Sequence, residues 1–156
     1  MRVKTSRFGE VEVPDREVLS FPRGLPGFAG LRRYVLIKTT DLGLFKWLQS
    51  ADVPELAFVV CDPRLIEPDY RVAIHHEELA DIELADVQAA EMLVILSYPQ
   101  EVEKMTANLQ GPIVINRARR LAKQVVLADE SYSCCHKVFQ ERPKESAGKV
   151  PDQSVA

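Results

Sequence analysis

Short hydrophobic runs, separated by Gly, Pro, Asp or Asn, recur along most of the chain. Those rich in Val, Ile, Phe and Tyr are RVKTSRF, EVEV, EVLSF, RYVLI, LAFVV, YRVAI, MLVILSY, GPIVIN and KQVVL. Short, evenly spaced runs of this composition are typical of β-strands. Residues 10–13 alternate Glu with Val, which indicates a half-buried strand, whereas residues 56–60 and 92–96 are continuously apolar, which indicates strands covered on both faces.

These runs predict a mainly β domain, a barrel or a sandwich. We expect a small closed or nearly closed antiparallel β-barrel, because closure removes bare sheet edges. The helical signal is weak: residues 76–91 contain good helix formers, but their apolar positions fit only one or two short helical turns. Residues 43–50 (GLFKWLQS) fit either a short turn or a strand, and the lone Trp47 is expected in the core.

The end of the chain has a different composition. The sequence QERPKESAGKVPDQSVA is polar, contains two prolines and a glycine, and has little apolar surface to bury. We therefore predict one β domain over residues 1–135 and a flexible polar tail over residues 136–156.

The composition favours a soluble protein of the cytoplasm. There is no apolar run long enough to span a membrane, and the start, MRVKTSRFGE, lacks the apolar stretch of a secretory signal. Three cysteines are an odd and sparse set, so reduced thiols are expected rather than a disulfide framework. The SCCH segment at residues 133–136 has no second cluster at metal-ligand spacing, so no metal is predicted.

Charge is distributed unevenly along the 156 residues, whose net charge is −3. Residues 62–103 contain eleven acidic and two basic side chains. A field of that sign repels nucleic-acid phosphates and attracts basic protein surfaces, although a solvated surface is an equally simple interpretation. An alternative function, a small RNA-binding β-barrel, rests on the basic cluster Arg117, Arg119, Arg120 and Lys123, which otherwise fits a solvated hairpin end.

Enzyme signatures fail at identifiable positions. His76-Glu77 begins like a zinc-protease motif, but Ala80 stands where the second histidine is required. No serine lies in a G-x-S-x-G elbow, and the glycines of residues 24–30 lack phosphate-loop or dinucleotide-binding spacing. A hydrolase built on Asp62, Asp69, His75 and His76 would need a pocket that gathers them. We predict neither an enzyme nor a cofactor.

Several specific stretches follow one another in order from residue 7 to about residue 132. They are RFGEVEV, FPRGLPGF, FKWLQSADVPELAFVVCDP, IEPDY, ANLQGPIVIN and KQVVL. Taken together, these stretches resemble the FliW family of flagellar assembly factors. The sequence departs from the family pattern at Leu121-Ala122, where the family often has a glycine. The tail beyond about residue 136 matches no family stretch.

The resemblance implies a non-enzymatic regulator with two protein partners. Proteins of this family bind flagellin in the cytoplasm and, when flagellin is depleted, bind CsrA, a small dimeric RNA-binding repressor of translation. Binding relieves repression of flagellin messenger RNA. On this basis the chain is expected to act without direct contact to nucleic acid, membrane or a small-molecule substrate.

Two segments are candidates for partner binding. In FPRGLPGF, an exposed Leu25 and Pro26 would present a rigid apolar spot, whereas the alternative is a purely structural loop in which Phe21 and Phe28 anchor the ends and the glycines permit positive φ. In the acidic segment, residues 62–103, the candidates are Glu77, Glu78, Asp81 and Glu83. The structural signature comprises Phe21, Gly24, Gly27, Phe28, Asn108 and Asn116, and the two asparagines are expected to close turns.

Overall fold

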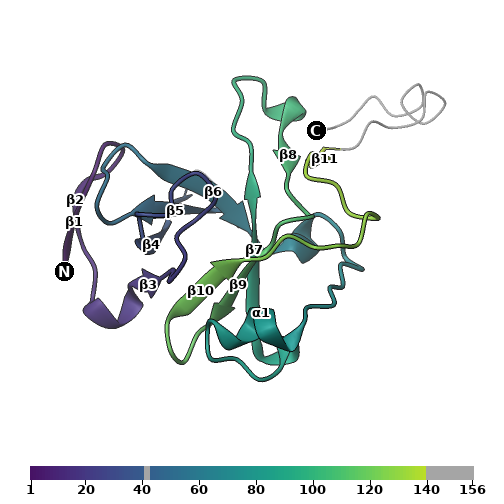
Figure 1. The fold of residues 1–156 in the computed structure, drawn as a ribbon. Coiled ribbons are helices and arrows are strands. Elements are labelled where there is room, and N and C mark those ends of the chain that lie inside the picture. Colours follow the sequence, from purple (N-terminus) through teal and green to yellow (C-terminus); the bar gives the residue numbers. More distant parts are fainter. Residues whose placement is uncertain (41–42, 140–156) are drawn as a thin grey trace.

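The computed structural model describes residues 1–40 and 43–139, and its regular secondary structure is mainly β-strand (Figure 1). The strands are β1 (Arg2–Thr5), β2 (Gly9–Glu12), β3 (Leu19–Ser20), β4 (Arg33–Lys38), β5 (Lys46–Ser50), β6 (Ala57–Cys61), β7 (Glu91–Leu96), β8 (Thr106–Ala107), β9 (Ile113–Asn116), β10 (Leu121–Gln124) and β11 (His136–Lys137). The helical elements are α1 (His76–Ala80) and the single 3-10 turns η1 (Asp15–Glu17), η3 (Pro63–Leu65), η4 (Val87–Ala89) and η5 (Val102–Lys104).

Seven of these strands close into a barrel. The order is β7-β6-β5-β4-β3-β10-β9, and β9 pairs again with β7. Strand β7 makes closure possible because it serves two neighbours: residues 91–93 pair with β9, and residues 94–96 pair with β6. The predicted closed, mainly β barrel is confirmed. The barrel is mixed rather than purely antiparallel, because β10 and β3 run parallel.

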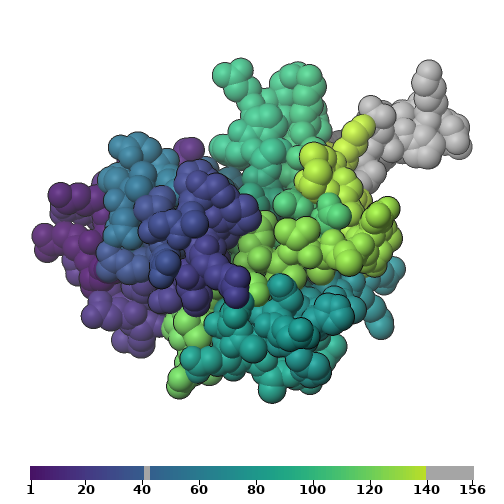
Figure 2. All heavy atoms as spheres, viewed as in Figure 1, coloured from purple at the N-terminus to yellow at the C-terminus, as the bar shows by residue number. Residues whose placement is uncertain are grey.

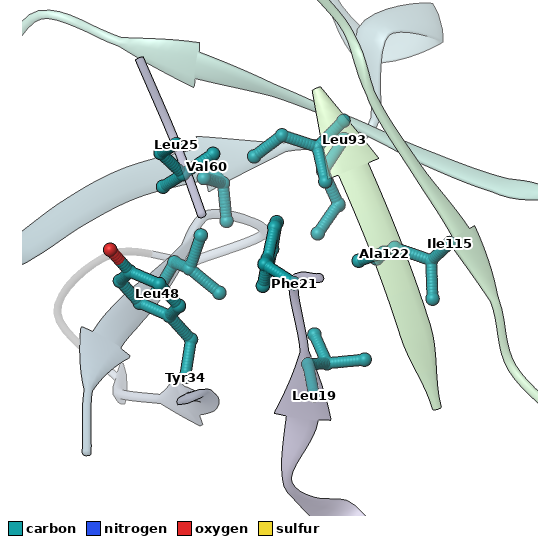
Figure 3. Close-up of a cluster of buried hydrophobic side chains, with 10 residues drawn as sticks. Leu19, Phe21, Leu25, Tyr34, Leu48, Val60, Leu93, Ile115 and Ala122 are labelled. Carbon is teal, nitrogen blue, oxygen red and sulfur yellow. The ribbon is translucent and has the colours of Figure 1, made fainter. Parts of the chain in front are cut away.

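The barrel interior holds one of the main hydrophobic clusters, drawn in Figure 3. Phe21 and Tyr34 are fully buried there, with their rings in an edge-to-face arrangement at a centroid distance of 5.1 Å. Side chains from strands far apart in sequence, including Leu48, Leu93 and Ile115, meet them. Apolar side chains from several strands therefore share the barrel interior, as expected for strands of a small barrel.

A second layer of packing lies outside the barrel, where α1 covers β9 and β10. Leu79 and Ile82 of the α1 segment pack with Val114 and Val125 in a separate cluster. The segment forms the teal lower part of the molecule in Figure 2. At five residues, α1 is much too short to cross a bilayer, and none of the helices in the described part of the chain has the length and apolarity to do so.

Three local predictions differ from the structure. The YRVAI run, residues 70–74, is not a strand: Tyr70 instead donates its hydroxyl to the Leu109 carbonyl at 2.7 Å, and Val72 packs into two clusters from a loop. Strands β8 and β11 were not predicted, because each has only two residues. β11 occupies the first two positions of the predicted tail, while residues 140–156 lie outside the described residues.

Candidate protein-binding site

The FPRGLPGF loop is a series of tight turns between β3 and β4. Backbone hydrogen bonds run from Gly24 N to Phe21 O (2.9 Å) and from Phe28 N to Leu25 O (2.7 Å). Gly24 has φ of 64°, and a Cβ at this position would lie 2.6 Å from the Phe28 carbonyl oxygen. Gly27 has φ of 85°. These two positions therefore require glycine, because an L side chain rarely adopts this backbone region.

The side chains of this loop are arranged differently from the expectation. Leu25 is only 2% exposed and belongs to the barrel core, so the prediction of an exposed Leu25 is wrong. Pro26 is exposed, as expected. Phe21 is a buried anchor, whereas Phe28 is 37% exposed and rests on Phe58 at a centroid distance of 6.0 Å. The turn at Gly24 carries Leu25 inward, so the apolar surface offered by the loop is Phe28 with Pro26.

A salt-bridge network joins this loop to the acidic segment. The Asp81 carboxylate lies 2.7 Å from Arg23 Nε of the loop and 2.6 Å from Lys123 Nζ of β10. The same Lys123 nitrogen lies 3.2 Å from Glu78 Oε2 and donates to the Glu78 carbonyl at 3.2 Å. We call Arg23, Glu78, Asp81 and Lys123 the loop–helix junction. It brings together the two segments that the sequence marked as candidates.

The junction is partly shielded from water, and this affects its charges. Lys123 is 9% exposed, so its ammonium group needs the partners it has. The hydrogen bond from Lys123, and then that from Arg23, hold the pKa of Asp81 below its ordinary value, because both favour the ionised carboxylate. Asp81 is therefore a charged structural link between three elements rather than a free surface acid.

Two asparagines position the neighbouring turns. Asn116 Nδ2 donates to the carbonyls of Ile82 (2.9 Å) and Glu83 (3.1 Å), which holds the end of the α1 segment against β9. Asn108 Oδ1 accepts from Gly111 N at 2.9 Å and closes the turn before β9. Both side chains bond to backbone, which is the structural role that the sequence favoured over a partner contact.

The four acidic candidates are not equivalent. Glu83 lies in the left-handed region with φ of 59° and pairs with Arg119 at 2.7 Å. Glu78 and Asp81 belong to the junction. Glu77, in the first turn of α1, is exposed and makes no ion pair with residues 1–40 or 43–139. Glu77 is thus the member of this set whose charge is directed to solvent without a partner.

Most cations of the basic cluster behind the RNA-binding alternative are also ion-paired. Arg117 Nε lies 3.5 Å from Glu91, and Arg119 pairs with Glu83. Arg120 donates to the Glu17 carbonyl at 3.0 Å, and Lys123 is buried in the junction. Three of the four cations lie beside carboxylates, while the partner of Arg120 is a backbone carbonyl. The pairing weakens the positive field of the cluster, so this arrangement does not favour phosphate binding.

Two neighbouring clefts lie on another part of the surface. One has a volume of about 580 Å³ and the other about 410 Å³, and Asp62, Glu91 and Met92 line both. The larger cleft gathers Asp62 and Asp69 but is not lined by His75 or His76, so the set required for a hydrolase is not assembled there. Within the described ranges, no group of three or more His, Cys, Asp or Glu side chains is arranged to hold a metal ion.

The sequence interpretation missed the two cations of the junction. Arg23 lies in the glycine-rich loop, where the local pattern indicates no partner for it, and Lys123 was assigned to the basic cluster. Both pair with Asp81, which is 58 and 42 positions away respectively in the chain, so no local pattern indicated the contacts. The signal that could have indicated such ion pairs is the excess of acids in residues 62–103, which lies between two segments with an excess of bases.

The closed seven-strand barrel places the chain in the class of small mixed β-barrel proteins. The model of a family described as FliW protein matches residues 2–138. A flagellar assembly factor FliW from Geotalea uraniireducens is 37% identical over 160 residues, which cover 99% of this chain and 98% of that protein. One from Leptospira interrogans is 38% identical and covers 93% of this chain and 97% of its own length.

A solved structure gives the same result at the level of the fold. The crystal structure of a flagellar assembly factor FliW superposes with a TM-score of 0.84 at 32% identity, and the match covers 92% of this chain and 100% of that one. The chain belongs to the FliW family of flagellar assembly factors, which are not enzymes.

Proposed function

We propose that this chain is a cytoplasmic partner-switching regulator. It binds flagellin when flagellin is plentiful; when flagellin is depleted, it binds the translational repressor CsrA and relieves repression of flagellin messenger RNA. The observation that carries the proposal is membership of the FliW family over residues 2–138. The sequence resemblance implies these partners, and the protein needs no cofactor, nucleic acid, membrane or small-molecule substrate for this role.

The charge of the surface supports the CsrA part of the proposal. RNA-binding proteins hold phosphates with basic side chains, so a negative surface docked beside such a site repels RNA without filling it. The acidic segment carries negative charge, but ion pairs offset the charges of Glu78, Asp81 and Glu83. We therefore assign the repulsion to acids that lack such pairs, with Glu77 as the candidate on α1.

The loop supports the protein-binding part. Its turns fix Pro26 and Phe28 on the surface while Phe21 and Leu25 hold it to the core. A preordered apolar spot binds a partner at a lower entropy cost than a mobile one. An ion pair between Arg23 and Asp81 links this loop to the segment that follows α1.

Pairwise binding tests the proposal. The protein is mixed with CsrA, and separately with flagellin, from the same organism and analysed by size-exclusion chromatography with light scattering. A complex with each partner is expected. Absence of both complexes would contradict the proposal, and steeply salt-dependent binding of the protein alone to RNA would support the RNA-binding alternative instead.

Two charge reversals test the surface. Glu77→Lys should weaken antagonism of CsrA, because it replaces an exposed acid by a base. The change breaks no ion pair within the part of the chain that the structure describes. Glu55→Lys is the matched control, since Glu55 is exposed but lies on the β5–β6 turn outside the acidic segment. Equal antagonism by the wild type and both variants would reject the repulsion mechanism but leave the pairwise binding result intact.

A further inference from the structure

Two adjacent thiols lie side by side on the surface, immediately before β11. Cys134 Sγ and Cys135 Sγ are 3.3 Å apart, and both side chains are exposed. The third cysteine, Cys61, is 1% exposed in the core, where burial raises the pKa of its thiol to about 12. The chain therefore has one accessible dithiol and one inert thiol within the same molecule.

The dithiol interrupts a segment that hydrogen bonds hold to β8. Before it, the Ser133 carbonyl accepts from Leu109 N at 3.0 Å. After it, β11 pairs antiparallel with β8, and Val138 N donates to the Met105 carbonyl at 3.0 Å. The two cysteines themselves form a small turn in which Cys135 N donates to Ser133 Oγ at 2.9 Å. Any change in the backbone at this turn therefore acts directly on the anchoring of β11.

We propose that Cys134 and Cys135 form a peroxide-sensitive dithiol, which a hydroperoxide oxidises to an intramolecular disulfide that loosens β11 from β8. In the first step one thiol attacks the hydroperoxide, the O–O bond breaks, and the products are a sulfenic acid and an alcohol, or water when the oxidant is hydrogen peroxide. In the second step the other thiol attacks the sulfenic sulfur, an S–S bond forms and water leaves. The two sulfurs lose two electrons, and the peroxide bond gains them.

The contact between the thiols assigns an order to these steps. The hydrogen bond with Cys134 is the main cause that raises the pKa of the Cys135 thiol. A raised pKa leaves less of Cys135 as the reactive thiolate, which favours Cys134 as the thiol that reacts first. Cys135 is then the resolving thiol, already in van der Waals contact with the sulfur it must attack.

The adjacency of the two residues makes the product reversible and disruptive. Cα atoms of consecutive residues are about 3.8 Å apart across a trans peptide, shorter than the roughly 4.4–6.8 Å that disulfides prefer. A disulfide between neighbours is therefore strained and easily reduced, as labile and regulatory disulfides are. The distortion falls on the peptide that links the Ser133 turn to β11. The bonds expected to weaken are therefore those that Leu109 N donates to the Ser133 carbonyl and Val138 N donates to the Met105 carbonyl.

Maleimide labelling with mass spectrometry tests the oxidation step on the full chain. The reduced protein should take label at Cys134 and Cys135, and Cys61 should stay unlabelled as an internal control. After hydrogen peroxide and its removal, the protein should take no label, be lighter by two hydrogen atoms, and regain both sites with dithiothreitol. Undiminished labelling, or a disulfide-linked dimer on a non-reducing gel, would overturn the proposal.

Single variants and hydrogen exchange test the order and the consequence. Cys135→Ser should trap a sulfenic acid on Cys134 that dimedone captures, and Cys134→Ser should trap much less; the reverse ratio would reject the assigned order. In the oxidised protein the Leu109 and Val138 amides should exchange about fivefold faster, as expected when a hydrogen bond of typical strength is lost. Val114, in the barrel, should not change. Unaltered exchange at all three would reject the loosening of β11.

Discussion

Truncation of Leu25 to alanine measures what the glycine-rich loop contributes to the fold. Leu25 is 2% exposed and packs in the barrel cluster, so the variant removes three buried carbon atoms. Their transfer to water costs about 2 kcal/mol. The cavity left behind adds to this, and the expected loss is about 3 kcal/mol, within the range seen for buried leucines. For a domain of this length the midpoint of thermal unfolding should fall by roughly 6–12 °C.

The assay is urea denaturation, with thermal unfolding alongside it. The matched control is Pro26→Ala, because Pro26 is the next residue and is exposed. Its loss should be less than about 1 kcal/mol, which comes from greater freedom of the unfolded chain. If Leu25→Ala changed the unfolding free energy by no more than Pro26→Ala, the placement of Leu25 in the core would be refuted.

The same pair of variants separates stability from partner binding. A loss of binding in Leu25→Ala would follow from damage to the core and would not identify a contact residue. A loss in Pro26→Ala, with stability retained, would identify the exposed part of the loop as a contact. Pro26, the exposed one of the two candidate residues, is therefore the useful probe of partner binding by this loop.

Two further predictions concern the loop and its junction. Gly24→Ala should destabilise the protein by about 2 kcal/mol in urea denaturation, because the position combines a φ of 64° with a Cβ contact of 2.6 Å to the Phe28 carbonyl oxygen. The control is Gly30→Ala, since a Cβ at Gly30 meets open space and its φ is not positive. Equal losses of stability in the two variants would refute the argument. Because the pKa of Asp81 is held below its ordinary value, the stability it contributes is present above about pH 4 and is lost as pH falls from there through the folded-state pKa. The stability difference between the wild type and Asp81→Asn should therefore shrink in that acidic range, and a difference that stays constant would contradict the assignment.

The sequence predicted the barrel well because its strands carry strong local signals. The continuous apolar runs at residues 56–60 and 92–96 became β6 and β7, two strands at the centre of the sheet. Apolar alternation at residues 70–74 was misleading, because packing and a hydroxyl bond bury Tyr70, and packing partly buries Val72, without a strand ladder. Apolar alternation reports burial, and burial does not require a strand.

The candidate site was predicted less completely. The sequence left two alternatives for the loop, an exposed Leu25 with Pro26 or a purely structural loop. A turn formed at a left-handed glycine fixes the direction of the next side chain, and sequence does not give that direction. The acidic character of the α1 segment was visible, whereas its neutralisation by Arg23 and Lys123 depends on contacts across more than forty positions. Composition gives the charges, and only the fold decides which of them are paired.

The central claim is a switch between two partners, and competition tests it most directly. The protein is first bound to CsrA and analysed by size-exclusion chromatography with light scattering, and flagellin from the same organism is then added in increasing amounts. The account predicts that the CsrA complex dissolves as a complex with flagellin appears. A CsrA complex that persists unchanged, or a stable complex of all three proteins, would contradict it.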